Sequence, residues 1–285
     1  MLKIEKITFG YSRRKPPVLT DISLSVEPGG VYGLLGRNGV GKSTLLYLIA
    51  GALTPNGGQV VFNGENTRRR LPSTMSEIFL VPEEFTLPSV TLNEFARANS
   101  RFYPRFSFED LRRHVETFEI SLSDNLGAIS MGQKKKAYMC FALAANTSLL
   151  MMDEPTNGLD IPGKSAFRRF IASSMNDERA ILISTHQVRD IDRLLDHVVI
   201  MENNSVLLDR SVSEITSRLA FMVTDSRRVV ENALFAQPAL GGNNVILPNP
   251  GGEETALNLE SLFEFALSKT DLLNRQFTPE DEKEY

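Results

Sequence analysis

A glycine-rich segment near the N-terminus carries the residue types that bind a phosphate chain. Residues 36–44 read G-R-N-G-V-G-K-S-T, which fits glycine, four residues, glycine, lysine and serine at every required position. Glycines let backbone N–H groups ring the phosphates, the lysine reaches the β- and γ-phosphates, and the serine hydroxyl binds Mg²⁺. A tight strand-to-helix turn alone would need only one glycine. The spacing therefore predicts a nucleoside triphosphate site made by Gly36, Arg37, Asn38, Gly39, Val40, Gly41, Lys42, Ser43 and Thr44.

Two adjacent carboxylates, Asp153 and Glu154, follow a wholly apolar run at residues 149–152. Such a run is typical of a strand buried on both faces of a parallel sheet. Because adjacent residues at a strand end point in different directions, one carboxylate can hold Mg²⁺ through water while the other orients or deprotonates the attacking water. We assign the metal role to Asp153 and the base role to Glu154. Four preceding apolar residues and the following Pro155 disfavour two solvated loop acids.

The order of these motifs resembles that of the nucleotide-binding subunits of ABC transporters, over residues 1 to about 215. Residues 129–133 (I-S-M-G-Q) resemble the family signature, residues 158–160 (G-L-D) its D-loop, and residues 184–186 (S-T-H) its switch histidine. The resemblance implies an ATPase that uses ATP and Mg²⁺. It also implies that Tyr11 stacks on adenine, although a tyrosine in a polar loop is ordinary. Stacking prefers no base strongly, so ATP over GTP rests on the resemblance.

The signature segment also has a simpler explanation as the start of a helix. Ser130 and Gln133 have the spacing of a capping box, which needs no ligand. The resemblance adds that this helix N-terminus points at the γ-phosphate held by a second subunit, with Ser130 and Gly132 donating to it. Met131 stands where the first of two glycines is usual, and it fits only if the backbone there needs no positive φ. We expect slower hydrolysis with nucleotide binding retained.

A second departure from the family pattern is Glu83, which stands where a glutamine usually contacts Mg²⁺ and water. A glutamate keeps an oxygen ligand, but its negative charge would be repulsive beside two acids and a triphosphate unless Mg²⁺ or a nearby cation offsets it. A metal ligand and an exposed loop acid both remain open for Glu83.

Among the three histidines, His186 is the candidate for chemistry. It follows an apolar strand at residues 180–185, at the sheet rim where open α/β sheets bind ligands. An isolated histidine after a strand would serve packing or the surface, but the motif order implies that His186 hydrogen-bonds the γ-phosphate. We expect His114 and His197 to be structural.

These motifs require an α/β fold: a P-loop NTPase core with a parallel sheet, an antiparallel β edge subdomain and an inserted α-helical subdomain. Strands beginning at residues 31, 149 and 180 make the parallel sheet, and residues 1–30 and 59–63 the antiparallel one. The predicted domains are an ATP-binding domain at 1–215 with a helical subdomain at about 77–145, and a small α/β appendage at 216–277. Residues 278–285 read as a disordered acidic tail.

Composition limits the remaining possibilities. The net charge of −4 gives no electrostatic footprint for nucleic acid, and short basic runs such as residues 134–136 usually form solvated faces. A lone cysteine, Cys140, fits a reducing compartment. Apolar runs long enough to cross a bilayer and an apolar signal region are both missing. We therefore expect a cytoplasmic location, peripheral on the inner face of the cell membrane.

One phosphate loop, one signature and no internal repeat predict that the chain must pair to act. The family resemblance implies a homodimer, or a heterodimer with another ATP-binding subunit, that encloses two ATP and drives a separate membrane permease docked near residues 79–105. A soluble clamp or regulator acting on protein or nucleic acid is an alternative, and a nucleotide switch without turnover is another. The sequence does not identify the transported substrate or the function of the appendage.

Overall fold

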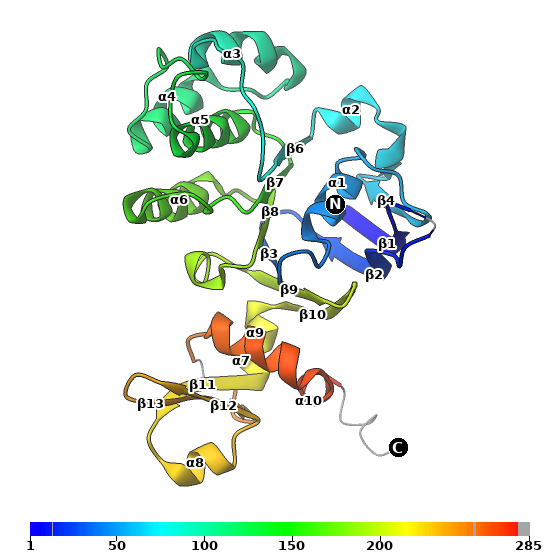
Figure 1. Ribbon diagram of the computed structural model, residues 1–285, viewed down its shortest axis with the longest axis vertical. Helices are drawn as coiled ribbons and strands as arrows, with labels where there is room; N and C mark the ends of the chain where they lie inside the picture. Colours follow the sequence, from blue (N-terminus) through cyan, green and yellow to red (C-terminus); the bar gives the residue numbers. More distant parts are fainter. Residues whose placement is uncertain (13, 253–254, 279–285) are drawn as a thin grey trace.

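The computed structural model describes residues 1–12, 14–252 and 255–278. A six-stranded sheet with strand order β10-β9-β3-β8-β7-β6 forms the centre of the molecule (Figure 1). Its first five strands along the chain are parallel and β10 is antiparallel. The strands are β3 (Val31–Gly36), β6 (Ile78–Val81), β7 (Leu149–Asp153), β8 (Ala180–Thr185), β9 (His197–Glu202) and β10 (Ser205–Ser211).

Both faces of this sheet are buried, which explains the uninterrupted apolar runs. Leu149 and Met151 of β7 face one hydrophobic core, whereas Leu150 and Met152 face the other. The parallel sheet of the predicted fold is therefore confirmed. Residues 78–81, within the helical subdomain predicted at about 77–145, form the edge strand β6 because their apolar run pairs with β7.

An antiparallel sheet of order β2-β1-β4-β5 covers one side of the core. Its strands are β1 (Leu2–Phe9), β2 (Leu19–Val26), β4 (Gly57–Phe62) and β5 (Glu65–Asn66). Buried residues of β1, such as Leu2 and Ile4, share one core with helix α1 (Lys42–Ile49) and with the central sheet. The predicted antiparallel subdomain thus lies directly against the helix that follows the phosphate loop.

Helices cover the opposite side of the sheet (Figure 1). They are α3 (Leu92–Asn99), α4 (Phe108–Thr117), α5 (Met131–Ala144) and α6 (Ile161–Ser174), while the short α2 (Pro72–Met75) lies elsewhere, just before β6. Aromatic rings of α3, α5 and β6 pack together, with Phe79 and Phe141 at the centre of the cluster. The aromatic residues of this helical region are therefore mainly core, although Phe102 remains 63% exposed.

The C-terminal appendage is an antiparallel sheet of order β11-β13-β12 with helices beside it. After α7 (Val212–Arg218) come β11 (Leu219–Thr224), α8 (Arg227–Glu231), β12 (Phe235–Ala239), β13 (Gly242–Pro248), α9 (Leu259–Ser268) and α10 (Thr270–Arg275). Ile246 of β13 and Phe265 of α9 belong to the same buried cluster as the helical side of the central sheet. Apart from Thr278, the predicted acidic tail lies outside the described residues.

Candidate nucleotide site

The glycine-rich loop connects β3 to α1, as predicted. Gly41 is the N-cap of α1 and has a φ of 107°, in the left-handed region. A Cβ at Gly41 would lie 2.7 Å from a methyl carbon of Leu19, and a Cβ at Gly36 would lie 2.7 Å from the carbonyl oxygen of Met201. Both positions therefore require glycine, the first for conformation and space, the second for space alone.

The Lys42 side chain folds back over this loop and is 5% exposed. Its Nζ donates to the carbonyl oxygens of Gly36 at 2.8 Å and Arg37 at 3.2 Å. The same ammonium lies 3.5 Å from Oε1 of Glu154. The loop thus holds the lysine in place, which would lower the ordering cost of binding a phosphate.

A cavity of about 300 Å³ opens beside the loop. Its lining contains most of the predicted phosphate-loop residues together with Tyr11, Glu83 and Glu154. The lining residues are Tyr11, Val18, Asn38, Gly39, Gly41, Lys42, Ser43, Thr44, Glu83 and Glu154. Val18 was missed by the sequence analysis, since an apolar residue just before a strand carries no chemical signal.

Two residues of the predicted phosphate loop point elsewhere. The Arg37 side chain is exposed and its Nη1 lies 3.6 Å from Oε1 of Glu202. The Val40 side chain is buried in the core shared with α1. Neither side chain lines the cavity.

Asp153 lies at the end of β7 next to the phosphate loop and is 3% exposed. Burial raises the pKa of its carboxyl group, while hydrogen bonds from the hydroxyls of Ser184 and Ser43 oppose that shift. A cation beside Asp153 would favour the carboxylate form. The pairing of the Ser43 hydroxyl with a buried carboxylate thus suits Mg²⁺, which prefers oxygen ligands and keeps several from phosphate and water. Among the described residues, His, Cys, Asp and Glu side chains form no group of three or more that could hold a metal ion alone.

Glu154 has a φ of 45°, an uncommon left-handed conformation for a side chain of this size. Its backbone N–H donates to the carbonyl oxygen of Ser184 at 2.9 Å, which ties the turn to the end of β8. Because of this turn, Asp153 and Glu154 point in different directions, Asp153 towards Ser43 and Glu154 into the cavity.

The Glu154 carboxylate is held by the end of β8. Its Oε1 accepts from the backbone N–H of His186 at 3.0 Å and lies 2.8 Å from Nδ1 of the same residue. Its Oε2 accepts from the Thr185 hydroxyl at 2.9 Å. The structure thus brings the two predicted catalytic residues, Glu154 and His186, into direct contact.

The residues that resemble the family signature lie outside this cavity. Ser130 caps α5, and both hydrogen bonds of the predicted capping box with Gln133 are present. Met131 is the first residue of α5, lacks a positive φ and is 59% exposed. A Cβ at Gly132 would lie 3.4 Å from the carbonyl oxygen of Gly158. The exposed helix start therefore sits beside the segment that resembles the D-loop, not over its own phosphate loop.

Tyr11 is 66% exposed at the cavity edge. Its hydroxyl makes a 3.0 Å hydrogen bond with Oγ1 of Thr44, and its ring packs edge-on against Phe9. These contacts leave much of the ring surface open to a base.

Glu83 lies at the cavity wall, where Oε1 accepts from Nδ2 of Asn157 at 2.9 Å. Lys135, in the second turn of α5, donates from Nζ to the carbonyl oxygen of the same asparagine at 3.0 Å. The basic run at residues 134–136 is therefore not a fully solvated face, because Lys135 is 4% exposed. Neither Asn157 nor Lys135 stood out in the sequence, since a loop amide and one lysine among three look like surface residues.

The other two histidines have structural surroundings. His114 is 8% exposed and packs edge-on against Phe170. The pKa of the His114 imidazole is lowered to about 4, mainly because the ring is buried. His197 stacks on Tyr32 and its Nε2 lies 2.5 Å from Oδ1 of Asp209. Neither lines the cavity.

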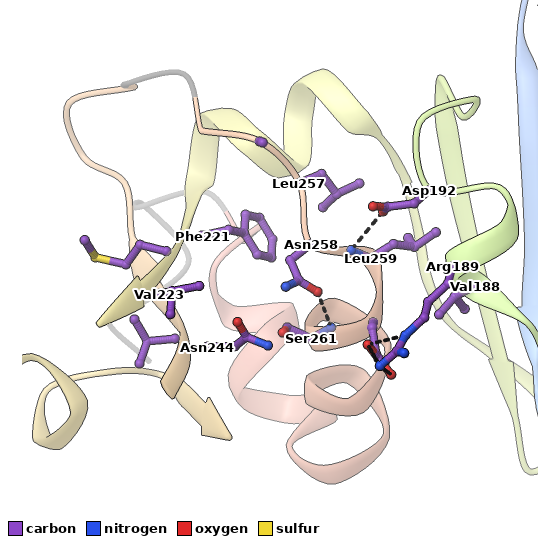
Figure 2. A pocket seen from close by; sticks show the side chains of 14 residues that line it. Val188, Arg189, Asp192, Phe221, Val223, Asn244, Leu257, Asn258, Leu259 and Ser261 are labelled. Atoms are coloured by element: carbon purple, nitrogen blue, oxygen red, sulfur yellow. Dashed lines mark hydrogen bonds and ion pairs between the residues drawn. The ribbon is translucent and has the colours of Figure 1, made fainter. Parts of the chain in front are cut away.

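The appendage contacts the segment directly after His186. Arg189, in the short helix η3 (Val188–Asp190), donates from Nε and Nη2 to the two carboxylate oxygens of Glu260, both at 2.9 Å. The backbone N–H of Leu259 donates to Oδ1 of Asp192 at 3.2 Å. Figure 2 shows these contacts at the edge of a cavity of about 350 Å³ between η3 and the appendage. The segment that follows His186 and the appendage are thus joined.

Comparison with known proteins agrees with this geometry. Residues 19–157 match the family model described as ABC transporter. A putative ABC transporter ATP-binding protein of Listeria monocytogenes is 33% identical over 75% of this chain and 84% of its own length. The ABC transporter ATP-binding protein YtrB of Bacillus subtilis is 30% identical over 66% of this chain, and the chain spans 65% of YtrB.

Comparison of the fold with solved structures also finds ABC transporter subunits. A solved ATP-binding subunit of an ABC transporter superposes with a TM-score of 0.68 at 27% identity, over 75% of this chain and 91% of the other. Within the described residues, the helices are too short or too polar to cross a membrane. From these matches and the phosphate-loop geometry, the chain belongs to the family of ABC transporter ATP-binding proteins, which are ATPases.

Proposed function

We propose that this ATPase works as a dimer that encloses two ATP and drives a separate membrane permease. The observation that supports pairing is the exposed start of α5 at Ser130 and Met131, which lies outside the cavity of its own chain. A helix N-terminus presents free N–H groups and partial positive charge, which suit a γ-phosphate. A second subunit would bring such a helix start to the open side of the cavity.

Within one chain, the cavity residues suit both the phosphates and the base of the nucleotide. Lys42 would bind the β- and γ-phosphates, and Tyr11 would stack on adenine. Ser43 and Asp153 would hold Mg²⁺, with Glu83 as a candidate for a further oxygen ligand. The bound Mg²⁺ would offset phosphate charge and polarise the reacting phosphoryl group.

Glu154 and His186 would then act on the attacking water and the γ-phosphate. The Glu154 carboxylate lies 3.5 Å from the Lys42 ammonium, so a base and a phosphate-binding cation share one site. Once nucleotide draws Lys42 to phosphate, the carboxylate, still held by Thr185 and His186, would orient or deprotonate water. His186 would hydrogen-bond the γ-phosphate and sense its loss, coupling hydrolysis to dimer opening.

The permease would dock on the helical side, within residues 79–105. Phe102 is 63% exposed there, between α3 and α4, whereas Phe79 is buried in the aromatic cluster. An exposed aromatic ring on a helical surface suits contact with a short helix of a partner. This arrangement would place the chain peripherally on the inner face of the cell membrane.

Isolation of the tagged Glu154→Gln chain from native membranes in mild detergent tests this proposal. This variant should trap ATP-bound dimers, so a stoichiometric multi-span protein is expected to co-purify. Recovery of a soluble partner alone, across several detergents with ATP present, would favour a soluble clamp or regulator instead.

A further inference from the structure

Lys135 is a buried cation that the proposed reaction does not use. It lies on the inner side of α5 and is 4% exposed. Its Nζ donates to the carbonyl oxygens of Glu154 at 2.8 Å and Asn157 at 3.0 Å. The lysine thus holds both ends of the turn that follows β7, including the residue with the left-handed backbone.

The charge of Lys135 faces a group of carboxylates. Burial lowers the pKa of its ammonium, whereas Glu83, Glu154 and Asp153 oppose that shift, with Glu83 the strongest of the three. A lysine that is almost fully buried keeps its charge only when such partners surround it. The contacts and the surrounding charges therefore agree that Lys135 belongs electrostatically to the nucleotide site.

Asn157 completes a physical link between Lys135 and Glu83. Its carbonyl oxygen accepts from Lys135, while its side-chain amide donates to Oε1 of Glu83 at 2.9 Å. The signature helix, the turn after β7 and the wall of the nucleotide cavity are therefore joined through one residue. Glu83 is also the position where an extra negative charge beside the triphosphate requires a compensating cation.

We propose that Lys135 and Glu83 form a compensating pair, in which Lys135 is a positioning residue that holds the turn after β7 and balances the carboxylate of Glu83. Without the ammonium, the Glu83 carboxylate would repel the triphosphate across the cavity. Removing the Glu83 charge as well would cancel that repulsion. The effects of the two substitutions on nucleotide affinity are therefore coupled and not additive.

The test is a double-mutant cycle of Lys135→Gln and Glu83→Gln. The quantity measured is the equilibrium Kd of a non-hydrolysable ATP analogue in the presence of Mg²⁺. Lys135→Gln should raise the Kd by about three- to tenfold, and the double variant should recover the part of that loss caused by the uncompensated Glu83 charge and bind at least about twofold more tightly than Lys135→Gln alone. Lys136→Gln is the matched control, because it removes one positive charge from the same helical turn and should leave the Kd unchanged.

The double variant binding as weakly as Lys135→Gln alone would overturn the proposal, as would an equal loss in Lys136→Gln. If Lys135→Gln does not fold, Asn157→Ala replaces it, since this change removes only the amide bridge. Asn157→Ala should weaken binding in the starting chain but not in the Glu83→Gln background, and an equal loss in both would refute the pairing.

This inference relies on the proposed nucleotide site but not on the base role of Glu154 or on the permease. The binding measurement involves no turnover and no partner. If the starting chain binds the nucleotide but the two substitutions show no coupling, only the pairing of Lys135 with Glu83 is rejected. Absence of nucleotide binding by the starting chain would reject the proposed site and the pair together.

Discussion

Glu154→Gln should separate ATP hydrolysis from ATP binding. A glutamine has nearly the same shape, and its carbonyl oxygen can replace Oε1, which accepts from the backbone N–H of His186. Its amide would then face the Thr185 hydroxyl, which can rotate from donor to acceptor. We therefore expect a loss of folding stability of only about 1 kcal/mol, the usual net worth of one hydrogen bond.

The effect on turnover should be much larger. An amide cannot take a proton from water, and loss of a general base lowers rates by about 10²- to 10⁴-fold. Because each tenfold change in rate corresponds to about 1.36 kcal/mol, the activation free energy should rise by about 2.7 to 5.4 kcal/mol. ATP binding should be retained or become tighter, because one negative charge leaves the neighbourhood of Lys42, which lies 3.5 Å from the carboxylate.

The assay is steady-state phosphate release at saturating Mg-ATP, paired with equilibrium binding of ATP. Glu84→Gln is the matched control, since it removes an exposed acid from the loop after β6 that does not line the nucleotide cavity. Turnover of Glu154→Gln within threefold of the starting chain would refute the base role. Loss of ATP binding in this variant would instead show that the carboxylate is needed to form the nucleotide site.

Three further predictions concern binding and stability. Lys42→Ala should raise the Kd for Mg-ATP by about 10- to 150-fold, the range for a charged hydrogen bond of 1.5 to 3 kcal/mol, and an unchanged Kd in a titration would reject its phosphate role. Tyr11→Ala should cost about 1 to 3 kcal/mol of ATP affinity while Tyr11→Phe keeps the stacking, so equal losses in both variants would assign the effect to the hydroxyl. The folded-state pKa of His114 is about 4 against 6.5 unfolded, so the unfolded chain binds more protons between these values and stability falls as pH drops through that window. At pH 5 the loss relative to pH 7.5 should be about 2 kcal/mol in denaturant unfolding, and a His114→Gln variant with the same pH dependence would contradict this origin.

Local chemistry let the sequence predict the phosphate loop and the ends of two strands. The lysine, serine and glycines of residues 36–44 act through short-range geometry, so their spacing alone predicts the loop. Asp153 and Glu154 were predictable for the same reason, because a buried strand must end at the rim of the sheet. The capping box of Ser130 and Gln133 is likewise a contact over three residues.

Other features depend on contacts between distant parts of the chain. Residues 78–81 are a strand only because β7 pairs with them, although 67 residues separate them from the start of that strand. The docking of α9 against η3 follows from a shared core and the ion pair of Arg189 with Glu260, which join segments far apart in the sequence. Packing partners of this kind leave no short-range pattern.

The sequence by itself determined that the chain binds a triphosphate and carries an acid pair beside it, because these functions depend on residue type and close spacing. Only the tertiary structure decided which of three consecutive lysines is buried and where it points. The two carbonyl groups that hold Lys135 are 19 and 22 residues away. The physical reason is that the role of a charge depends on its surroundings, and those surroundings are assembled only when α5 packs against the turn after β7.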